Sequence, residues 1–249
     1  MCTILVAWQI DPEAPLMLTA NRDELLARPT EGPQALVDEP RIVGGRDVLA
    51  GGTWIAVAAG GRVAAVTNRR VTSRDPARRS RGEIPVLLLR HQDDPAAQHA
   101  MAELDPADYN PGNVLYASRD HAYVAHLEGA RTRMVELTPG LHAVTTVDLD
   151  DPDDAKVGRL LAGMEAIVAR GHPVEEAVVR LEHLLEDHGP DRSAGLEAAC
   201  IHGDVYGTRS SSSVILWADG RITYRHAPGR PCEHPREDVS SLLLASAPA

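Results

Sequence analysis

The chain has 249 residues, of which 43% are hydrophobic and 24% are charged, and its formal net charge is −11. This composition predicts a soluble globular protein, and the acidic balance argues against broad nucleic-acid binding, which needs a basic face. No apolar run approaches the ~20 residues that cross a bilayer, and the N-terminus lacks the basic start of a signal peptide. We therefore expect one cytoplasmic domain over residues 1–249, with no disulfide framework among its three cysteines.

The first half of the chain predicts two β-hairpins followed by two helices. Alternating apolar residues predict strands at 3–9, 16–20, 53–59 and 62–68. Asp11-Pro12-Glu13 supplies the first turn and Gly60-Gly61 the second. The Pro- and Gly-bearing segment between the hairpins predicts a loop, and helical patterns follow at 83–91 and 95–104.

The second half predicts strands, then two amphipathic helices, then a last hairpin. The strands are expected at 113–118, 121–127, 132–137 and 141–147, and the helices near 154–170 and 174–187. The last hairpin covers 205–217 and 221–226, and the Pro-rich tail from about 228 is expected to be peripheral. Because strands pair in hairpins and helices are grouped between them, the pattern indicates an α+β fold with antiparallel sheets.

Cys2 is the most informative candidate for chemistry. Removal of Met1 would leave a thiol and a free α-amine on one residue, and an amine with a pKa of ~7.7–8.0 can serve as the thiol's own base. The alternative is a cysteine that simply begins a buried strand.

Polar residues at two strand ends are expected to join Cys2. Arg22 could steady a thiolate or a substrate carboxylate, Asp23 could tune the α-amine, and the Asn68 amide could donate to an oxyanion. The alternatives are a solvated ion cluster for the first two and a simple turn residue for Asn68. The six arginines between Arg69 and Arg81 could receive an anionic group, or form a solvated loop.

Two short Cys-x-His motifs, Cys200-x-His202 and Cys232-x-His234, suggest a Cys₂His₂ metal site. Their spacing does not match the usual zinc patterns, so we expect no metal site.

Several motifs resemble the NRDE family, also called the transport and Golgi organisation 2 family. The matching segments, in family order over about 210 residues, are Met1-Cys2-Thr3, Asn21-Arg22-Asp23-Glu24, Arg28-Pro29, Gly44-Gly45-Arg46-Asp47, Gly51-Gly52-Thr53-Trp54, Thr67-Asn68-Arg69, Ser80-Arg81-Gly82, Leu149-Asp150, Lys156-Val157 and Tyr206-Gly207-Thr208-Arg209-Ser210. The resemblance implies an N-terminal-nucleophile (Ntn) hydrolase-like αββα sandwich, similar to the cholylglycine-hydrolase and penicillin-V-acylase amidases.

The same resemblance implies roles for individual residues. It makes Cys2 the nucleophile, Arg22 and Asp23 its partners, Asn68 an oxyanion donor and Arg209 a late site residue. The ligand-binding positions that it adds are Asn21, Glu24, Trp54, Thr67, Tyr206 and Thr208. Thr145-Thr146 stands where such proteins usually place an Asn, which puts a second oxyanion donor in doubt.

Two functions remain open at this stage. The first is a Cys2-dependent hydrolase of a non-peptide amide or thioester that works through an acyl-enzyme and needs no cofactor. The second is a carrier that holds an amphipathic ligand such as haem or acyl-CoA, with Cys2 or one of the eleven His as an axial haem ligand. A free amino terminus at Cys2 would favour the first.

Overall fold

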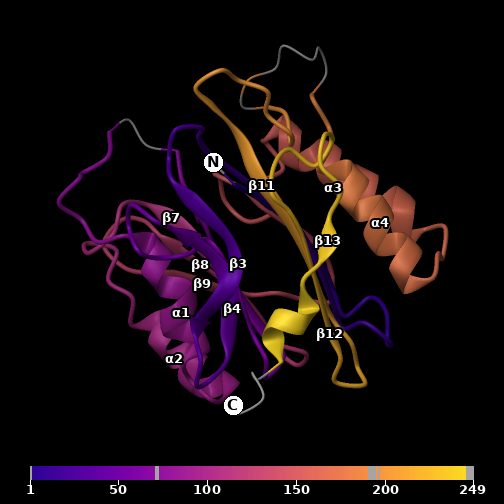
Figure 1. Cartoon of the computed structure of the whole chain (residues 1–249), viewed down its shortest axis with the longest axis horizontal. Helices are drawn as coiled ribbons and strands as arrows, with labels where there is room; N and C mark the ends of the chain where they lie inside the picture. Colours follow the sequence, from indigo (N-terminus) through magenta and orange to yellow (C-terminus); the bar gives the residue numbers. More distant parts are fainter. Residues whose placement is uncertain (1, 71–72, 190–194, 196, 245–249) are drawn as a thin grey trace.

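The computed structural model describes residues 2–70, 73–189, 195 and 197–244. They form two antiparallel sheets with helices outside, in the layer order that the sequence predicts (Figure 1). Four helices were expected, and the structure has them at α1 (Ile84–Leu89), α2 (Asp94–Ala102), α3 (Ala155–Val168) and α4 (Val174–Leu184). No helix among the described residues is long and apolar enough to cross a membrane.

The first sheet has the strand order β10-β1-β2-β11-β12-β13. Its strands are β1 (Cys2–Trp8), β2 (Leu16–Leu25), β10 (Gly140–Val144), β11 (Tyr206–Leu216), β12 (Ile222–Ala227) and β13 (Glu237–Asp238). The second sheet follows the chain order from β3 to β9. Its strands are β3 (Thr30–Val37), β4 (Ile42–Asp47), β5 (Ile55–Ala58), β6 (Arg62–Asn68), β7 (Gly112–Ala117), β8 (Ala122–Leu127) and β9 (Arg133–Glu136).

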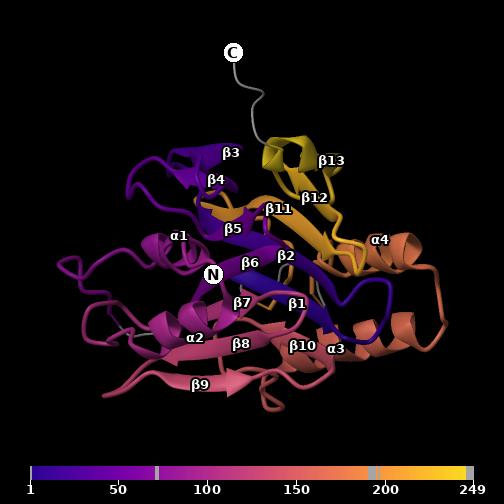
Figure 2. The same cartoon turned by 90° about the horizontal axis from the view of Figure 1, so that it is seen from below.

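Strand β1 shows how the layers arise from the sequence. Its side chains alternate between two apolar cores, because successive residues of a strand point to opposite faces. Ile4 and Val6 lie in the core that the two sheets share, whereas Leu5 and Ala7 pack with residues of α3 and α4. Figure 2 shows the same layers from below, with α1 and α2 on one side and α3 and α4 on the other. This alternation places Cys2 on the face between the sheets.

The prediction of a loop between the first two hairpins is wrong, because this segment forms β3 and β4. Strand β3 carries Gly32 and Pro33, lies at the sheet edge and changes register twice against β4. Proline is tolerated on an edge strand, where its missing N–H breaks no ladder hydrogen bond. The described part of the C-terminal tail also packs onto the fold: β13 pairs with β12, and Leu243 is buried in the core that the sheets share.

Candidate functional site

A cavity of about 480 Å³ opens beside the start of β1. It is lined by Cys2, Arg22, Asp23, Glu24, Arg28, Thr30, Gly45, Arg46, Asp47, Ala50, Thr53, Trp54, Val66, Asn68, Arg74, Asp75, Pro76, Arg78, Arg79, Ser80, Arg81, Gly82 and Asn110. The structure thus brings the predicted quartet of Cys2, Arg22, Asp23 and Asn68 to one cavity, together with Glu24 and Trp54. Its volume lies in the range of small-molecule sites, about 300–1,000 Å³.

The β1–β2 hairpin sets the position of Cys2. Its register pairs Cys2 directly with Arg22, so both side chains stand on the same face of the sheet. Arg22 is buried; its Nη1 donates to Thr30 Oγ1 at 3.2 Å, and its Nη2 lies 3.9 Å from Glu24 Oε2. These contacts hold the guanidinium next to the sulfur.

The Asp23 carboxyl is buried next to Cys2. Thr208 Oγ1 donates a 2.6 Å hydrogen bond to Asp23 Oδ1. Burial raises the pKa of Asp23 to about 6, against the opposing charges of Lys156 and Arg22. The carboxyl therefore changes charge near neutral pH, where it can tune a neighbouring amine.

The Cys2 thiol is also buried. Burial raises its pKa, and the negative charge of Asp23 adds to this, whereas Arg22 lowers it. The resting group is therefore the neutral thiol, and a nucleophilic role needs a base to remove its proton.

Arg81 was expected only as a member of the six-arginine loop, and sequence reasoning missed its buried place beside Cys2. Arg81 is buried, and burial lowers its pKa to about 10 while the charge of Cys2 raises it. Its Nη1 donates to the carbonyls of Asn110 and Pro111. A glycine allows the segment around Arg81 to approach its neighbour closely. A Cβ on Gly52 would lie 2.4 Å from the Gly82 backbone, so the two segments can be in contact only because Gly52 has no side chain.

Lys156 is the second residue that sequence reasoning missed. It lies at the start of α3 and is buried, which lowers its pKa, while the charges of Asp23 and Asp154 raise it. It also interacts electrostatically with Cys2. A signal was present: Lys156 is the only lysine of a chain whose other cations are arginines.

Other predicted site residues lie behind the cavity and hold its wall. Asn21 Nδ2 donates to the carbonyls of Leu185 and Ala199, at 2.8 and 2.9 Å. Tyr206 donates its hydroxyl to the Asp23 carbonyl at 2.9 Å, and Arg209 Nη1 donates to the Leu26 carbonyl at 2.6 Å. None of these three side chains lines the cavity.

The Thr145-Thr146 segment also lies behind the cavity wall. Both residues are buried, and neither lines the cavity. The Thr145 carbonyl accepts from Thr67 Oγ1, and from Asn113 Nδ2 at 2.9 Å. Thr67 therefore binds the Thr145 backbone and does not line the cavity.

Arginines dominate the cavity rim. Four of the six arginines of the predicted cationic loop line it, namely Arg74, Arg78, Arg79 and Arg81. By contrast, Arg69 lies away from the cavity in ion pairs with Glu128 and Asp148, both at 2.7 Å.

Two of the rim arginines are free to bind an anion. Arg78 donates to the Tyr109 carbonyl, and Arg79 pairs with Glu83. The side chains of Arg46 and Arg74 are exposed, and neither guanidinium makes a hydrogen bond or ion pair with the described residues. The cavity can therefore offer two unpaired guanidinium groups to an anionic ligand.

Among the described residues that line the cavity, Cys2 is the only soft metal ligand, and no histidine joins it. A haem carried here would have to use the Cys2 sulfur as its protein axial ligand.

Comparison with known proteins identifies the family. The family model for Transport and Golgi organisation 2 matches residues 1–226. Curated relatives include the Transport and Golgi organization 2 homologs of Mus musculus (25% identical over 233 residues) and Homo sapiens (26% over 233). That of Bos taurus is 28% identical over 234 residues, and each match covers 84% of this chain and of the relative.

Solved structures share the fold at much lower identity. A variant of conjugated bile acid hydrolase from Clostridium perfringens superposes with a TM-score of 0.60 at 9% identity, covering 99% of this chain and 95% of that one. The Caenorhabditis elegans ortholog of N-acylethanolamine-hydrolyzing acid amidase gives 0.54 at 10% identity, covering 86% and 92%. The chain therefore belongs to the transport and Golgi organisation 2 family and has the αββα fold of the Ntn hydrolases.

Proposed function

We propose that this protein is a Cys2-dependent hydrolase of a non-peptide amide or thioester that carries an anionic group. The observation that carries the proposal is the position of Cys2, at the start of β1, opposite Arg22 and inside a cavity of about 480 Å³. The fold shared with a bile acid hydrolase and an acid amidase supports it.

The reaction would proceed in two steps. With Met1 removed, the α-amine of Cys2 takes the thiol proton, and Sγ bonds to the substrate carbonyl carbon. The bond to the leaving nitrogen or sulfur breaks, the leaving group takes that proton, and a thioester to Cys2 remains. Water then cleaves the thioester and regenerates the thiol. The Asn68 amide at the cavity would donate to the oxyanion of both steps.

The mass of the purified protein tests this mechanism. It should begin at Cys2 and gain one acyl group when incubated with a panel of acyl amides and thioesters, and peptide mapping should locate that group on Cys2 rather than Cys200 or Cys232. Cys2→Ala should bind the same ligands without turnover, and Cys2→Ser should lose most turnover because a hydroxyl is the poorer nucleophile. Retained Met1 together with the absence of an adduct would end the hydrolase proposal.

A carrier function is the second candidate, and one observation favours it. Burial raises the pKa of the Cys2 thiol, so the resting group is a neutral thiol rather than a thiolate, as expected of a passive pocket residue. A carrier of haem or acyl-CoA predicts that Cys2→Ala changes ligand affinity or the haem spectrum, with no acyl adduct in the wild type.

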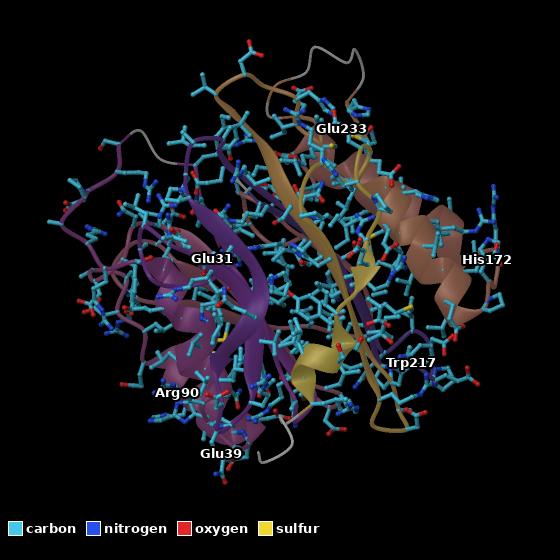
Figure 3. All side chains as sticks on the ribbon, in the orientation of Figure 1. Glu31, Glu39, Arg90, His172, Trp217 and Glu233 are labelled. Carbon is cyan, nitrogen blue, oxygen red and sulfur yellow. The ribbon has the colours of Figure 1, made fainter. Side chains whose placement is uncertain are left out.

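The unpaired rim arginines give a test of the anionic ligand that is independent of turnover. In the Arg46→Ser/Arg74→Ser variant, the affinity for acetyl-CoA should fall roughly tenfold, the effect of one or two lost charge-assisted contacts. Calorimetry at low salt gives the largest difference, because screening is least there. Arg90→Ser/Arg170→Ser is the matched control, because both arginines are exposed and lie outside the cavity. The two substitutions change the net charge by the same amount as Arg46→Ser/Arg74→Ser. Arg90 is labelled in Figure 3. Equal losses in both variants would make the effect one of net charge alone.

A further inference from the structure

Four metal-ligating side chains meet at a second place in the fold, outside the cavity. They are His188, Cys200, His202 and Cys232, and one ligand atom from each lies within 4.8 Å of all the others. His188 follows α4, Cys200 and His202 precede β11, and Cys232 belongs to the tail after β12. The set differs from the two Cys-x-His motifs in one member, because His188 takes the place of His234.

Four of the six separations lie within a few tenths of an ångström of the edges of a tetrahedron around one small cation. Cys200 Sγ lies 3.5 Å from Cys232 Sγ and 3.7 Å from His202 Nε2. His202 Nε2 lies 3.1 Å from both Cys232 Sγ and His188 Nε2. With Zn–S of ~2.3 Å and Zn–N of ~2.0–2.1 Å, tetrahedral edges fall at about 3.3–3.8 Å. The two remaining pairs, from His188 to each sulfur, lie within 4.8 Å. Shifts of up to about 1 Å would therefore complete the coordination.

The donor set is specific for a soft or borderline metal. Both cysteines are free, and two sulfurs with two imidazole nitrogens suit Zn²⁺ rather than Mg²⁺ or Ca²⁺, which take oxygen ligands. His202 is exposed while Cys200 is buried, so the cluster lies at the surface, where an ion can enter.

A carboxylate lies behind one of the ligands, just beyond hydrogen-bond distance. Glu233 Oε1 lies 3.6 Å from His202 Nδ1, on the opposite side of the ring from the nitrogen that faces the sulfurs. Arg230 Nη1 holds both Glu233 oxygens at 3.3 Å. Figure 3 labels Glu233 beside the segment that leads to β11. A carboxylate on the free nitrogen of a histidine is a recurrent arrangement behind metal ligands, where it orients the ring.

We propose that His188, Cys200, His202 and Cys232 bind one Zn²⁺ ion in a structural site. The ion would tie the C-terminal tail to the chain between α4 and β11. That segment in turn reaches the cavity: Ile201 N–H donates to Thr208 Oγ1 at 2.9 Å, and Thr208 donates to Asp23. The metal would therefore hold the wall behind Asp23 without touching the substrate.

Metal content and a cobalt spectrum test the site without any assay of activity. Reduced protein loaded with Zn²⁺ and freed of excess should retain about one ion per chain. Titration with Co²⁺ should give the intense visible bands of tetrahedral cobalt and a thiolate charge-transfer band. Cys232→Ser and His188→Gln should each weaken Zn²⁺ binding at least tenfold, and Glu233→Gln should weaken it about 10- to 100-fold as the loss of a supporting carboxylate. His234→Gln is the control and should bind as the wild type does.

Three results would overturn the site. The first is reduced wild-type protein that retains no Zn²⁺, and the second is bound cobalt without the thiolate band. The third is His234→Gln losing as much affinity as His188→Gln. If removal of a cysteine prevents folding, Zn²⁺ binding by the milder Glu233→Gln variant still tests the site.

Discussion

The buried charges around Cys2 come from side chains that are far apart in the sequence. Lys156 enters from α3, Asp23 from β2 and Arg81 from the segment before α1. Burial shifts the pKa of each group in the direction that favours its neutral form. Nearby opposite charges partly offset this shift. The group behaves as one network, so the loss of one member must change the titration of the others.

Replacing Lys156 should reveal this coupling. The folded pKa of Asp23, about 6, lies above the ordinary aspartate value of 3.8, so its contribution to stability falls as pH rises from about 3.8 to 6 and is constant above that. Lys156→Met removes the largest charge that favours the carboxylate, so the pKa of Asp23 should rise further. We expect the free energy of unfolding to fall by up to about 3 kcal/mol near pH 8, and by less as the pH approaches 5.

Urea unfolding at pH 5 and pH 8 measures this loss. The Lys156→Met/Asp23→Asn double variant should recover part of it, because no buried carboxylate is then left without its partner. A deficit that is the same at both pH values, in the single and the double variant, would show that Lys156 only fills space.

Much of the candidate site could be predicted from the sequence because it depends on local pairing. A hairpin whose connection is centred on Asp11-Pro12-Glu13 brings Arg22 back to Cys2, and this register is present. Arg81 and Lys156 could not be found this way, because they reach the site through tertiary contacts that no local pattern records. The six-arginine loop predicted a cationic rim but not which arginines form it. Spacing cannot distinguish Arg69, whose side chain forms ion pairs, from Arg74, whose side chain lines the cavity.

At the scale of elements, strands were predicted well where alternation was strong and poorly where it was interrupted. The strands of the first hairpin, β1 and β2, are apolar and appear where expected, although β2 continues to Leu25. Strand β3 has no fully buried residue and contains both Gly32 and Pro33, so its pattern is that of a loop. Its pairing with β4 comes from the sheet it joins, and this shows how tertiary context overrides local propensity.

Two glycines in α3 give an element-scale prediction. A Cβ on Gly158 would meet nothing within 4 Å, whereas a Cβ on Gly163 would lie 2.8 Å from Leu184 Cδ2 of α4. Gly158→Ala should therefore raise the free energy of unfolding by about 0.5–1 kcal/mol, the usual gain from replacing a helical glycine. Gly163→Ala has the same gain in propensity but must displace the Leu184 side chain, so its melting temperature should stay below that of Gly158→Ala.

Thermal unfolding of the two variants side by side checks this prediction. The wild type is the common reference, and the two substitutions are chemically identical within one helix. Equal stabilisation by both alanines would mean that α3 and α4 do not approach each other closely at Gly163.

At the scale of the whole molecule, the two sheets share one core, and each contributes a buried histidine. His126 on β8 belongs to the second sheet, and its Nδ1 lies 2.8 Å from Asn113 Oδ1. His226 on β12 belongs to the first, and its Nδ1 lies 3.0 Å from Ser212 Oγ. Burial lowers the pKa of both to about 4; Arg133 and Arg69 add to this at His126, and Arg236 at His226. Each sheet therefore buries a histidine that stays neutral in the folded protein until the pH falls to about 4.

These histidines should make the fold sensitive to acid. Between pH 6.5 and 4 the unfolded chain binds a proton at each position that the folded chain does not, so stability falls as the pH falls, by at most about 1.4 kcal/mol per pH unit for each group. His142 acts in the opposite sense: burial opposes its protonation, but hydrogen bonds to Asp150 and the Thr138 carbonyl raise its pKa. Its contribution is therefore present at low pH and is lost as the pH rises through its folded pKa.

Urea midpoints measured from pH 7.5 to 4.5 separate these contributions. In His126→Gln and His226→Gln, whose amides can replace the ring nitrogen in the hydrogen bond, the acid loss should be shallower than in the wild type. His142→Gln should instead steepen it, because a histidine whose pKa is raised in the folded state is gone. His183→Gln, on the exposed face of α4, is the control for replacing a histidine outside the buried core. If the two core variants lose stability with acid as steeply as the wild type, carboxylates such as Asp148, whose pKa is held low by Arg69 against the opposing effect of burial, must dominate the acid limit instead.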